Sequence, residues 1–227
     1  PAALGDTGGD SDVTPLSIAS IGVAKAAVFA EPVDNSNYID IGYRFVIANT
    51  GTVALSDVSL EDNLIERIGE AYAGIVAGPS VDANGTNFTQ PNPGALPNLL
   101  EGATGELQPG ERINVDLRVR IDAQLIEGNQ ISNYADVSAT PVGGANPITD
   151  RSDSGNDPSG NNGNGGSNDT TVINLLDSDG DGILDSFETG GDRDGDGIPN
   201  DQDLDPSGYF YCQEDGKILT GGSIIVS

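Results

Sequence analysis

The chain has 227 residues and a formal net charge of -27 at pH 7, from 36 acidic residues against 9 basic ones. This length allows one sizeable core and an accessory module, and the charge argues against nucleic acid or an anionic membrane as a partner, because both need a basic patch. The chain has no His, Met or Trp and one Cys, so it lacks the commonest general base and zinc ligand and cannot form an internal disulfide. No apolar run approaches the roughly 18–20 residues that span a bilayer.

The N-terminal residues 1–14, PAALGDTGGDSDVT, are small and polar, and we expect a flexible tail. Because the chain starts at Pro1 and shows no signal peptide, we also expect that a targeting segment was removed or that the chain is a fragment. From residue 15 onward the pattern is that of β-strands. The first of these, PLSIASIGVAKAAVFA, is apolar and β-prone.

Two further segments alternate apolar and polar residues with the period of a half-buried strand. These segments are YIDIGYRFVIAN and RINVDLRVRID, and VALSDVSLED, QISNYADVSAT and TVINLL are additional candidates. Their predicted buried faces are Ile39, Ile41, Tyr43, Phe45 and Ile47 in the first, and Ile113, Val115, Leu117, Val119 and Ile121 in the second. EDNLIERI is predicted to form one or two helical turns. Short strands with regular turns predict an all-β fold, a β-sandwich over residues 15–176.

Two stretches of this region lack a clear pattern. Residues 71–97 are irregular and proline-rich, and residues 149–170 are dominated by Gly, Asn and Asp. The second stretch is either a flexible linker between domains or a long loop inside the sandwich, with TVINLL returning as the last strand.

FVIANTGTVALSDVSLED, LQPGERINVDLRVRI and ISNYADVSAT together resemble the Ig-like repeat of large bacterial and archaeal surface proteins. The resemblance implies an Ig-like sandwich that serves as an architectural module without catalytic residues. Some surface Ig-like domains form a Lys–Asn crosslink from a lysine in the sandwich, and Lys25 is the only lysine of the predicted sandwich region. We favour the alternative that the Lys25 ammonium reaches out from its strand to solvent.

Other reactive or modifiable residues receive structural interpretations. The acid pair Glu61 and Asp62 could imitate glycosidase carboxylates, but we expect a solvated strand edge. Cys212 directly follows aromatic residues and is predicted to be a packed thiol. The sequons at Asn84, Asn87 and Asn168 lie in loop-like sequence and leave glycosylation open.

The stretch from Asp177 places acidic residues with the spacing D-x-D-x-D-G-x5-E, which is that of a calcium loop. Calcium takes six to eight oxygen ligands, and the glycine at the sixth position permits the sharp turn. The frame restarts 15 residues later at Asp192. The predicted ligands are Asp177, Asp179, Asp181, the carbonyl of Ile183, Asp185 and Glu188 in the first loop, and Asp192, Asp194, Asp196, the carbonyl of Ile198, Asn200 and Asp203 in the second.

The two loops depart from a paired EF-hand, because too few residues separate them to form a helix and because Pro199 has no N–H to donate. DRDGDGIPNDQDLD most closely resembles the thrombospondin type 3 calcium repeat. That resemblance implies two further ligands, Asp201 and Asp205, and a calcium-stiffened spacer over residues 177–206 that holds two or more ions.

Residues 207–227 resemble the opening hairpin of a further β-module, and they are too few to build a core. We expect either the start of another domain or strands that add to another sheet. The favoured function is therefore an extracellular, non-enzymatic, calcium-binding structural protein of a cell-surface fibre or surface layer, which assembles head to tail by strand addition without membrane insertion. The alternatives are an adhesin module for a glycan or receptor and an accessory domain of a larger secreted protein.

Overall fold

A computed structural model describes residues 16–33, 36–82, 96–103, 105–126, 128–159 and 169–176. Beyond these it describes 178–179, 184–185, 188, 191–192 and 197–203. The predicted tail 1–14, the three sequon asparagines, Cys212 and the C-terminal residues 207–227 lie outside the described residues. None of the helices in the described part of the chain is long and apolar enough to span a membrane.

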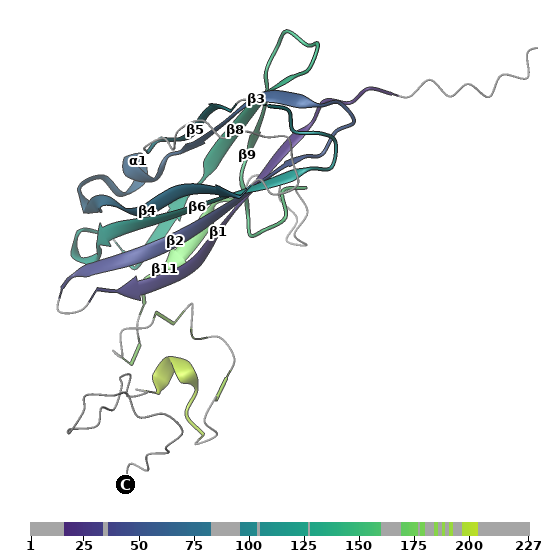
Figure 1. The fold of residues 1–227 in the computed structure, drawn as a ribbon. Helices are drawn as coiled ribbons and strands as arrows, with labels where there is room; N and C mark the ends of the chain where they lie inside the picture. Colours follow the sequence, from purple (N-terminus) through teal and green to yellow (C-terminus); the bar gives the residue numbers. More distant parts are fainter. Residues whose placement is uncertain are drawn as a thin grey trace, which may run out of the picture.

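The fold is an all-β sandwich of two main sheets (Figure 1). The first sheet has the order β10-β1-β2-β6-β4, with β10 at Asp153–Ser154, β1 at Ile21–Pro32, β2 at Tyr38–Asn49, β6 at Arg112–Asp122 and β4 at Tyr72–Asp82. The second has the order β5-β3-β8-β9, with β5 at Asn98–Ala103, β3 at Leu55–Asp62, β8 at Ala135–Pro141 and β9 at Ile148–Arg151. The sandwich prediction is therefore confirmed.

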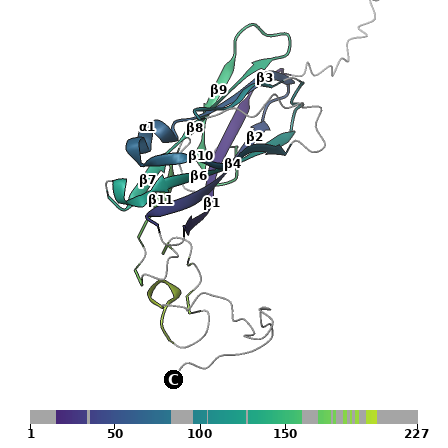
Figure 2. The ribbon, with the colours of Figure 1, turned by 60° about the vertical axis from the view of Figure 1, so that its left-hand side comes forward.

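Two short strands form a separate pair at one end of the sandwich. They are β7, Gln130–Asn133, and β11, Thr171–Asn174, which run antiparallel. The helix α1, Leu64–Ile68, and the 3-10 turns η1, Gly69–Ala71, and η2, Ala123–Leu125, lie near the same end. Figure 2 shows β7 and β11 next to β1 in a second view, which agrees with the contacts between β1 and β11. This pair brings the end of the sandwich sequence back to its first strand.

The alternation in the sequence explains the two central strands. All five residues of each predicted face in β2 and β6 are buried in one apolar cluster, and the strands pair in register from Tyr38 opposite Asp122 to Ala48 opposite Arg112. On the opposite face of β2, however, Asp40 is also buried, because Arg118 and Arg120 of β6 both contact its carboxylate. The predicted helical turns are confirmed as α1.

The two stretches without a clear pattern contain strands. Residues 72–82, in the stretch expected to be irregular, form β4, whose pairing with β6 is interrupted by register shifts. Residues 148–154, at the start of the Gly/Asn/Asp-rich stretch, form β9 and β10, which pair with β8 and β1. In both cases a neighbouring strand supplies the hydrogen bonds that local sequence preference does not reveal.

Candidate functional site

Lys25 lies in the core, so the expectation that its ammonium reaches solvent is wrong. The side chain is fully buried, and its Nζ lies 4.3 Å from the ring centre of Tyr43 and 5.4 Å from that of Phe45. Val23 and Lys25 of β1 lie opposite inward residues of β2. The lysine therefore occupies a position where an apolar residue would be expected. A charged group there needs a partner inside the core.

That partner is Asp62, the last residue of β3. The Lys25 Nζ lies 2.6 Å from Asp62 Oδ2, and neither side chain is exposed. The inward residues of β3 are Leu55, Val58, Leu60 and Asp62, so the carboxylate points into the core and Glu61 points out. The expected solvated strand edge is therefore wrong for Asp62, whereas Glu61 is exposed to solvent on a strand that pairs on both sides.

Asn133 completes a buried group of three side chains. It ends β7, is fully buried, and donates from Nδ2 to Asp62 Oδ1 over 2.9 Å. The backbone N–H of Leu64 donates to the same oxygen over 2.8 Å. The carbonyl oxygen of the Asn133 carboxamide is buried and has no hydrogen-bond partner among the described residues. Asp62 thus bridges a lysine amine and an asparagine amide, one on each carboxylate oxygen.

Burial controls the ionisation of this group. Desolvation lowers the pKa of Lys25, while the charge and the hydrogen bond of Asp62 act in the opposite direction. Burial also raises the pKa of Tyr43 well above its usual value, and the Asp62 charge adds to this shift. The net effect lowers the pKa of Lys25 below its ordinary value, which shifts the amine toward its neutral, nucleophilic form relative to an exposed lysine.

The three side chains come from strands far apart in the sequence, which is why sequence analysis did not connect them. The signals available were a lysine among apolar residues in β1, an acid at an inward position of β3, and an asparagine at an inward position of β7. Each of these positions points to a buried site only when it is known which residues of the strand face inward, because a shift of one residue moves every side chain to the other face.

The predicted calcium ligands are described in part. Asp177, Asp181, Ile183, Asp194, Asp196 and Asp205 lie outside the described residues, whereas Asp179, Asp185, Glu188, Asp192, Ile198, Asn200, Asp201 and Asp203 lie within them. Among the described residues no cluster of three or more acidic, His or Cys side chains forms a metal site. Because each loop lacks some of its predicted ligands, this result does not test the calcium prediction.

The described parts of the two loops show local curling. In the second loop, the backbone N–H of Gly197 donates to the carboxylate of Asp192 over 2.8 Å, which joins the sixth position to the first. In the first loop, Asp185 accepts from the backbone N–H and the hydroxyl of Ser178, each over 2.7 Å. Leu184 is buried and belongs to the apolar cluster of the sandwich. The first loop therefore has an apolar contact with the folded domain.

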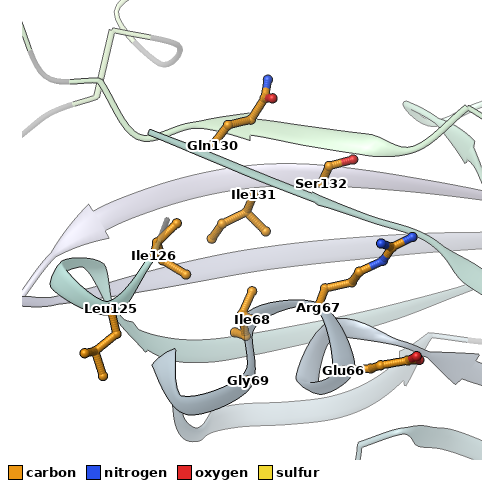
Figure 3. Close-up of a pocket in the computed structure, with 9 residues that line it drawn as sticks. All are labelled: Glu66, Arg67, Ile68, Gly69, Leu125, Ile126, Gln130, Ile131 and Ser132. Atoms are coloured by element: carbon orange, nitrogen blue, oxygen red, sulfur yellow. The ribbon is translucent and has the colours of Figure 1, made fainter. Parts of the chain in front are cut away.

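A separate surface pocket of about 340 Å³ lies between α1, η2 and β7 (Figure 3). Ile68, Ile126 and Ile131 point toward one another inside it, and Glu66 and Arg67 lie at its side. The lining residues include no aromatic side chain. Since aromatic residues are typical of recognition surfaces, we do not assign a ligand to this pocket.

No known protein family matches the chain, and no curated protein resembles it significantly. Among solved structures it is similar to the major pilin SpaD of Corynebacterium diphtheriae, with a TM-score of 0.37 and 14% identity over 59% of this chain and 34% of that one. It is also similar to BcpA, the major pilin subunit of Bacillus cereus, with a TM-score of 0.35 and 10% identity over 59% of this chain and 38% of that one. For a FixG-related protein of Vibrio parahaemolyticus the TM-score is 0.24 and the identity 11%, over 59% of this chain and 92% of that one. At these TM-scores the structural similarity is weak.

Proposed function

We propose that this chain is an extracellular structural protein whose sandwich is locked by an amide bond between the Lys25 and Asn133 side chains. The observation that carries the proposal is the buried carboxylate of Asp62, which contacts the lysine amine over 2.6 Å and the asparagine amide over 2.9 Å. A plain ion pair needs no asparagine, and a plain hydrogen-bonded asparagine needs no lysine. Nucleophile, proton carrier and carboxamide together are the components of an amide exchange.

The chain's own residues account for every atom of the reaction. Lys25 first gives a proton to Asp62, and its neutral Nζ attacks Cγ of Asn133. Asp62 then passes that proton to Asn133 Nδ2 and takes one from the attacking nitrogen. The bond between Cγ and Nδ2 breaks, ammonia leaves, and a Lys25–Asn133 amide remains. The reaction occurs once per chain, so it gives a stable product without a separate substrate.

The mass of the intact chain tests this proposal. We expect the folded wild-type protein to be lighter than its sequence by one ammonia molecule, and peptide mapping to find the β1 and β7 peptides joined. Lys25→Met, Asp62→Ala and Asn133→Ala should each have the full sequence mass. Asn49→Ala is the matched control, because Asn49 is also buried and hydrogen-bonded but contacts Val53 and Leu107 instead of this group.

A wild-type chain with the full sequence mass would exclude the amide bond. The three side chains would then be a structural ion pair with a hydrogen-bonded asparagine. A mass loss that persists in Asn133→Ala would place the crosslink elsewhere. The Asn49→Ala variant distinguishes a specific effect from a general loss of folding, because it removes buried hydrogen bonds of the same kind.

The second part of the proposal is calcium binding by the two loops at residues 177–206. It rests on the spacing of the acidic residues and is supported by the Asp192–Gly197 contact, which curls the second loop. Without a cation, the carboxylates of each loop repel one another, so calcium should order the segment. Extracellular calcium is abundant enough for such sites, with dissociation constants of roughly 10⁻⁴–10⁻³ M.

Calorimetry and limited proteolysis test the calcium sites. We expect uptake of at least two ions per chain at millimolar calcium, and we expect chelator to expose residues 177–206 to protease while the sandwich remains intact. Asp181→Ala and Asp196→Ala should weaken uptake, whereas Asp116→Ala on the surface of β6 should not. Absence of calcium uptake by the wild-type chain would exclude this part of the proposal and leave the amide bond unaffected.

The third part is assembly into a cell-surface fibre or layer by head-to-tail strand addition. β1 pairs within its own chain with β2 and β10, so the proposed donor is the segment 207–227. The long outer edge of β4 in the first sheet is a place where a neighbour's strand could add. Electron microscopy in calcium and in chelator tests this: filaments in calcium that soften or dissociate in chelator are expected, and monomers in both conditions would favour an adhesin module or an accessory domain.

A further inference from the structure

Thr171 connects the backbones of the two residues proposed to react. Its hydroxyl donates to the main-chain carbonyl of Lys25 over 2.7 Å. In the ladder between β11 and β7, Thr171 lies directly opposite Asn133. Its side chain is nearly fully buried. One residue of the last strand thus contacts the strand of the amine and the strand of the carboxamide.

No strand pairing in the described residues joins these two strands directly. β1 belongs to the first sheet, and β7 pairs with β11 alone. The second donor to the Lys25 carbonyl is the backbone N–H of Gly155, over 2.9 Å, and it belongs to the β10 end of the first sheet. The Thr171 hydroxyl therefore gives β1 a direct hydrogen bond to the β7–β11 pair at the level of the site.

We infer that Thr171 is a positioning residue for the formation of the Lys25–Asn133 amide. This inference rests on the proposed amide bond. Attack by an amine on a carboxamide is sensitive to placement, and a displacement of about 1 Å can slow such a step roughly a hundredfold. Thr171 does not touch the reacting atoms. It acts by holding the main chain of Lys25 at a fixed distance from that of Asn133.

An order of events follows from this role. Thr171 lies 38 residues after Asn133 and 146 after Lys25 in the chain. Both reacting residues and Asp62 therefore emerge well before the residue that positions them. The amide should form rapidly only after β11 has docked, so a partly synthesised or partly exported chain stays uncrosslinked and can still rearrange.

The test follows amide formation in freshly made full-length chain. Protein from cell-free translation is chased, quenched at intervals, and analysed by intact mass for the loss of ammonia. Thr171→Val keeps the shape and removes the hydroxyl, and we expect it to slow the loss roughly tenfold to a hundredfold. Thr171→Ser keeps the hydroxyl and should react at nearly the wild-type rate. Thr170→Val is the matched control, because Thr170 is exposed and its hydroxyl contacts Ser132 instead.

A second measurement separates positioning from general destabilisation. Thr171 carries no titratable group, so Thr171→Val should lower the rate at every pH without moving the pH profile. Circular dichroism checks that the variant is folded. The inference is overturned if Thr171→Val reacts as fast as wild type, or if Thr171→Ser is as slow as Thr171→Val. If the wild-type chain itself loses no ammonia, the proposed amide bond fails, and that result is distinct from a failure of Thr171 alone.

Discussion

Lys25 and Asp62 present an energetic problem that the amide bond would remove. Transfer of a lysine and an aspartate into a core costs several kcal/mol per ion, and their attraction offsets this only with good geometry. Here the geometry is good, since the two charged atoms are 2.6 Å apart, but the carbonyl oxygen of Asn133 is buried without a described partner. After the reaction the lysine carries no charge, and the cost of burying an ammonium disappears.

Removal of one member of the pair should destabilise the fold strongly. In an Asn133→Ala background, where no amide can form, Asp62→Ala leaves the Lys25 ammonium buried alone and should lower the free energy of unfolding by about 3–5 kcal/mol. Replacement of both charges, by Lys25→Met with Asp62→Leu, should recover most of that loss. Urea unfolding measures both. If the single and double replacements are equally unstable, the destabilisation does not come from an unpaired charge.

The lowered pKa of Lys25 predicts a pH dependence in the same Asn133→Ala background. Burial places the folded-state pKa below the ordinary value of 10.5. Between these two values the unfolded chain binds more protons at Lys25 than the folded chain, so stability rises with pH across that window. A companion variant with both Asn133→Ala and Lys25→Met should lack this rise. Urea unfolding from neutral pH to about pH 10 compares the two, and parallel curves would contradict the prediction.

At the scale of single residues, the sequence indicated individual members of the site but not that they lie together. Lys25 was identified as a possible crosslinking residue, and the outward orientation predicted for it was wrong. Asp62 and Asn133 were recognised within strands but not connected to Lys25. Asp62 lies 37 residues from Lys25 and 71 residues from Asn133 in the sequence, and contacts over such separations are not encoded by one-dimensional periodicity. The calcium ligands, in contrast, follow from local spacing, and they stay a prediction.

At the scale of elements, the segment that contains β9 and β10 ties the two sheets together beside Lys25. The carboxylate of Asp150 accepts from the Val23 N–H over 2.9 Å. The backbone N–H of Ser152 donates to the Ala135 carbonyl over 2.8 Å, and the Ala135 N–H donates to the Ser152 hydroxyl over 3.0 Å. One short segment thus contacts β1 in the first sheet and β8 in the second. It covers the edge of β1 at the position of the buried lysine.

Gly22 of β1 packs against the end of this segment. A Cβ added at Gly22 would clash with the carbonyl oxygen of Pro158, so Gly22→Ala requires the backbone to move. We expect a loss of about 1–3 kcal/mol in the free energy of unfolding and slower formation of the amide, because the same segment binds the Lys25 carbonyl. Gly144→Ala, whose Cβ would meet Pro141 at 3.1 Å in the turn between β8 and β9, is the control and should change both quantities less.

Strands could be predicted from the sequence where apolar and polar residues alternate regularly. β2 and β6 alternate so regularly that their buried faces were predicted completely. β4 contains two glycines and one proline in GIVAGP, and β10 is two residues long. Neither strand therefore shows a regular alternation of apolar and polar residues. Both exist because a regular neighbour, β6 or β1, offers an edge of backbone hydrogen-bonding groups.

For the whole molecule, the proposed amide determines how tension passes through the sandwich. The chain enters at β1 and leaves after β11, so a pull on its ends reaches Lys25 first and crosses the amide to Asn133. Residues 26–132 then lie outside the path of the force. From Asn133 the load passes to β11 through the ladder between β7 and β11. Asn133 anchors one end of that ladder and Asn174 is pulled from the other, so the hydrogen bonds are loaded together in shear.

Failure of the ladder would release residues 134–174 and leave the rest of the sandwich closed. A fully extended chain gains about 3.4 Å per residue, so the crosslinked protein should lengthen by at most roughly 140 Å in one step. Asn133→Ala lacks the amide, and the release of residues 21–174 should give roughly 500 Å. Single-molecule force spectroscopy with handles at the two ends measures these steps. Asn49→Ala keeps the amide, and its hydrogen bonds to Val53 and Leu107 lie outside the path of the force, so it should retain the short step. A long step in crosslinked wild-type chains would show that the amide does not carry the load.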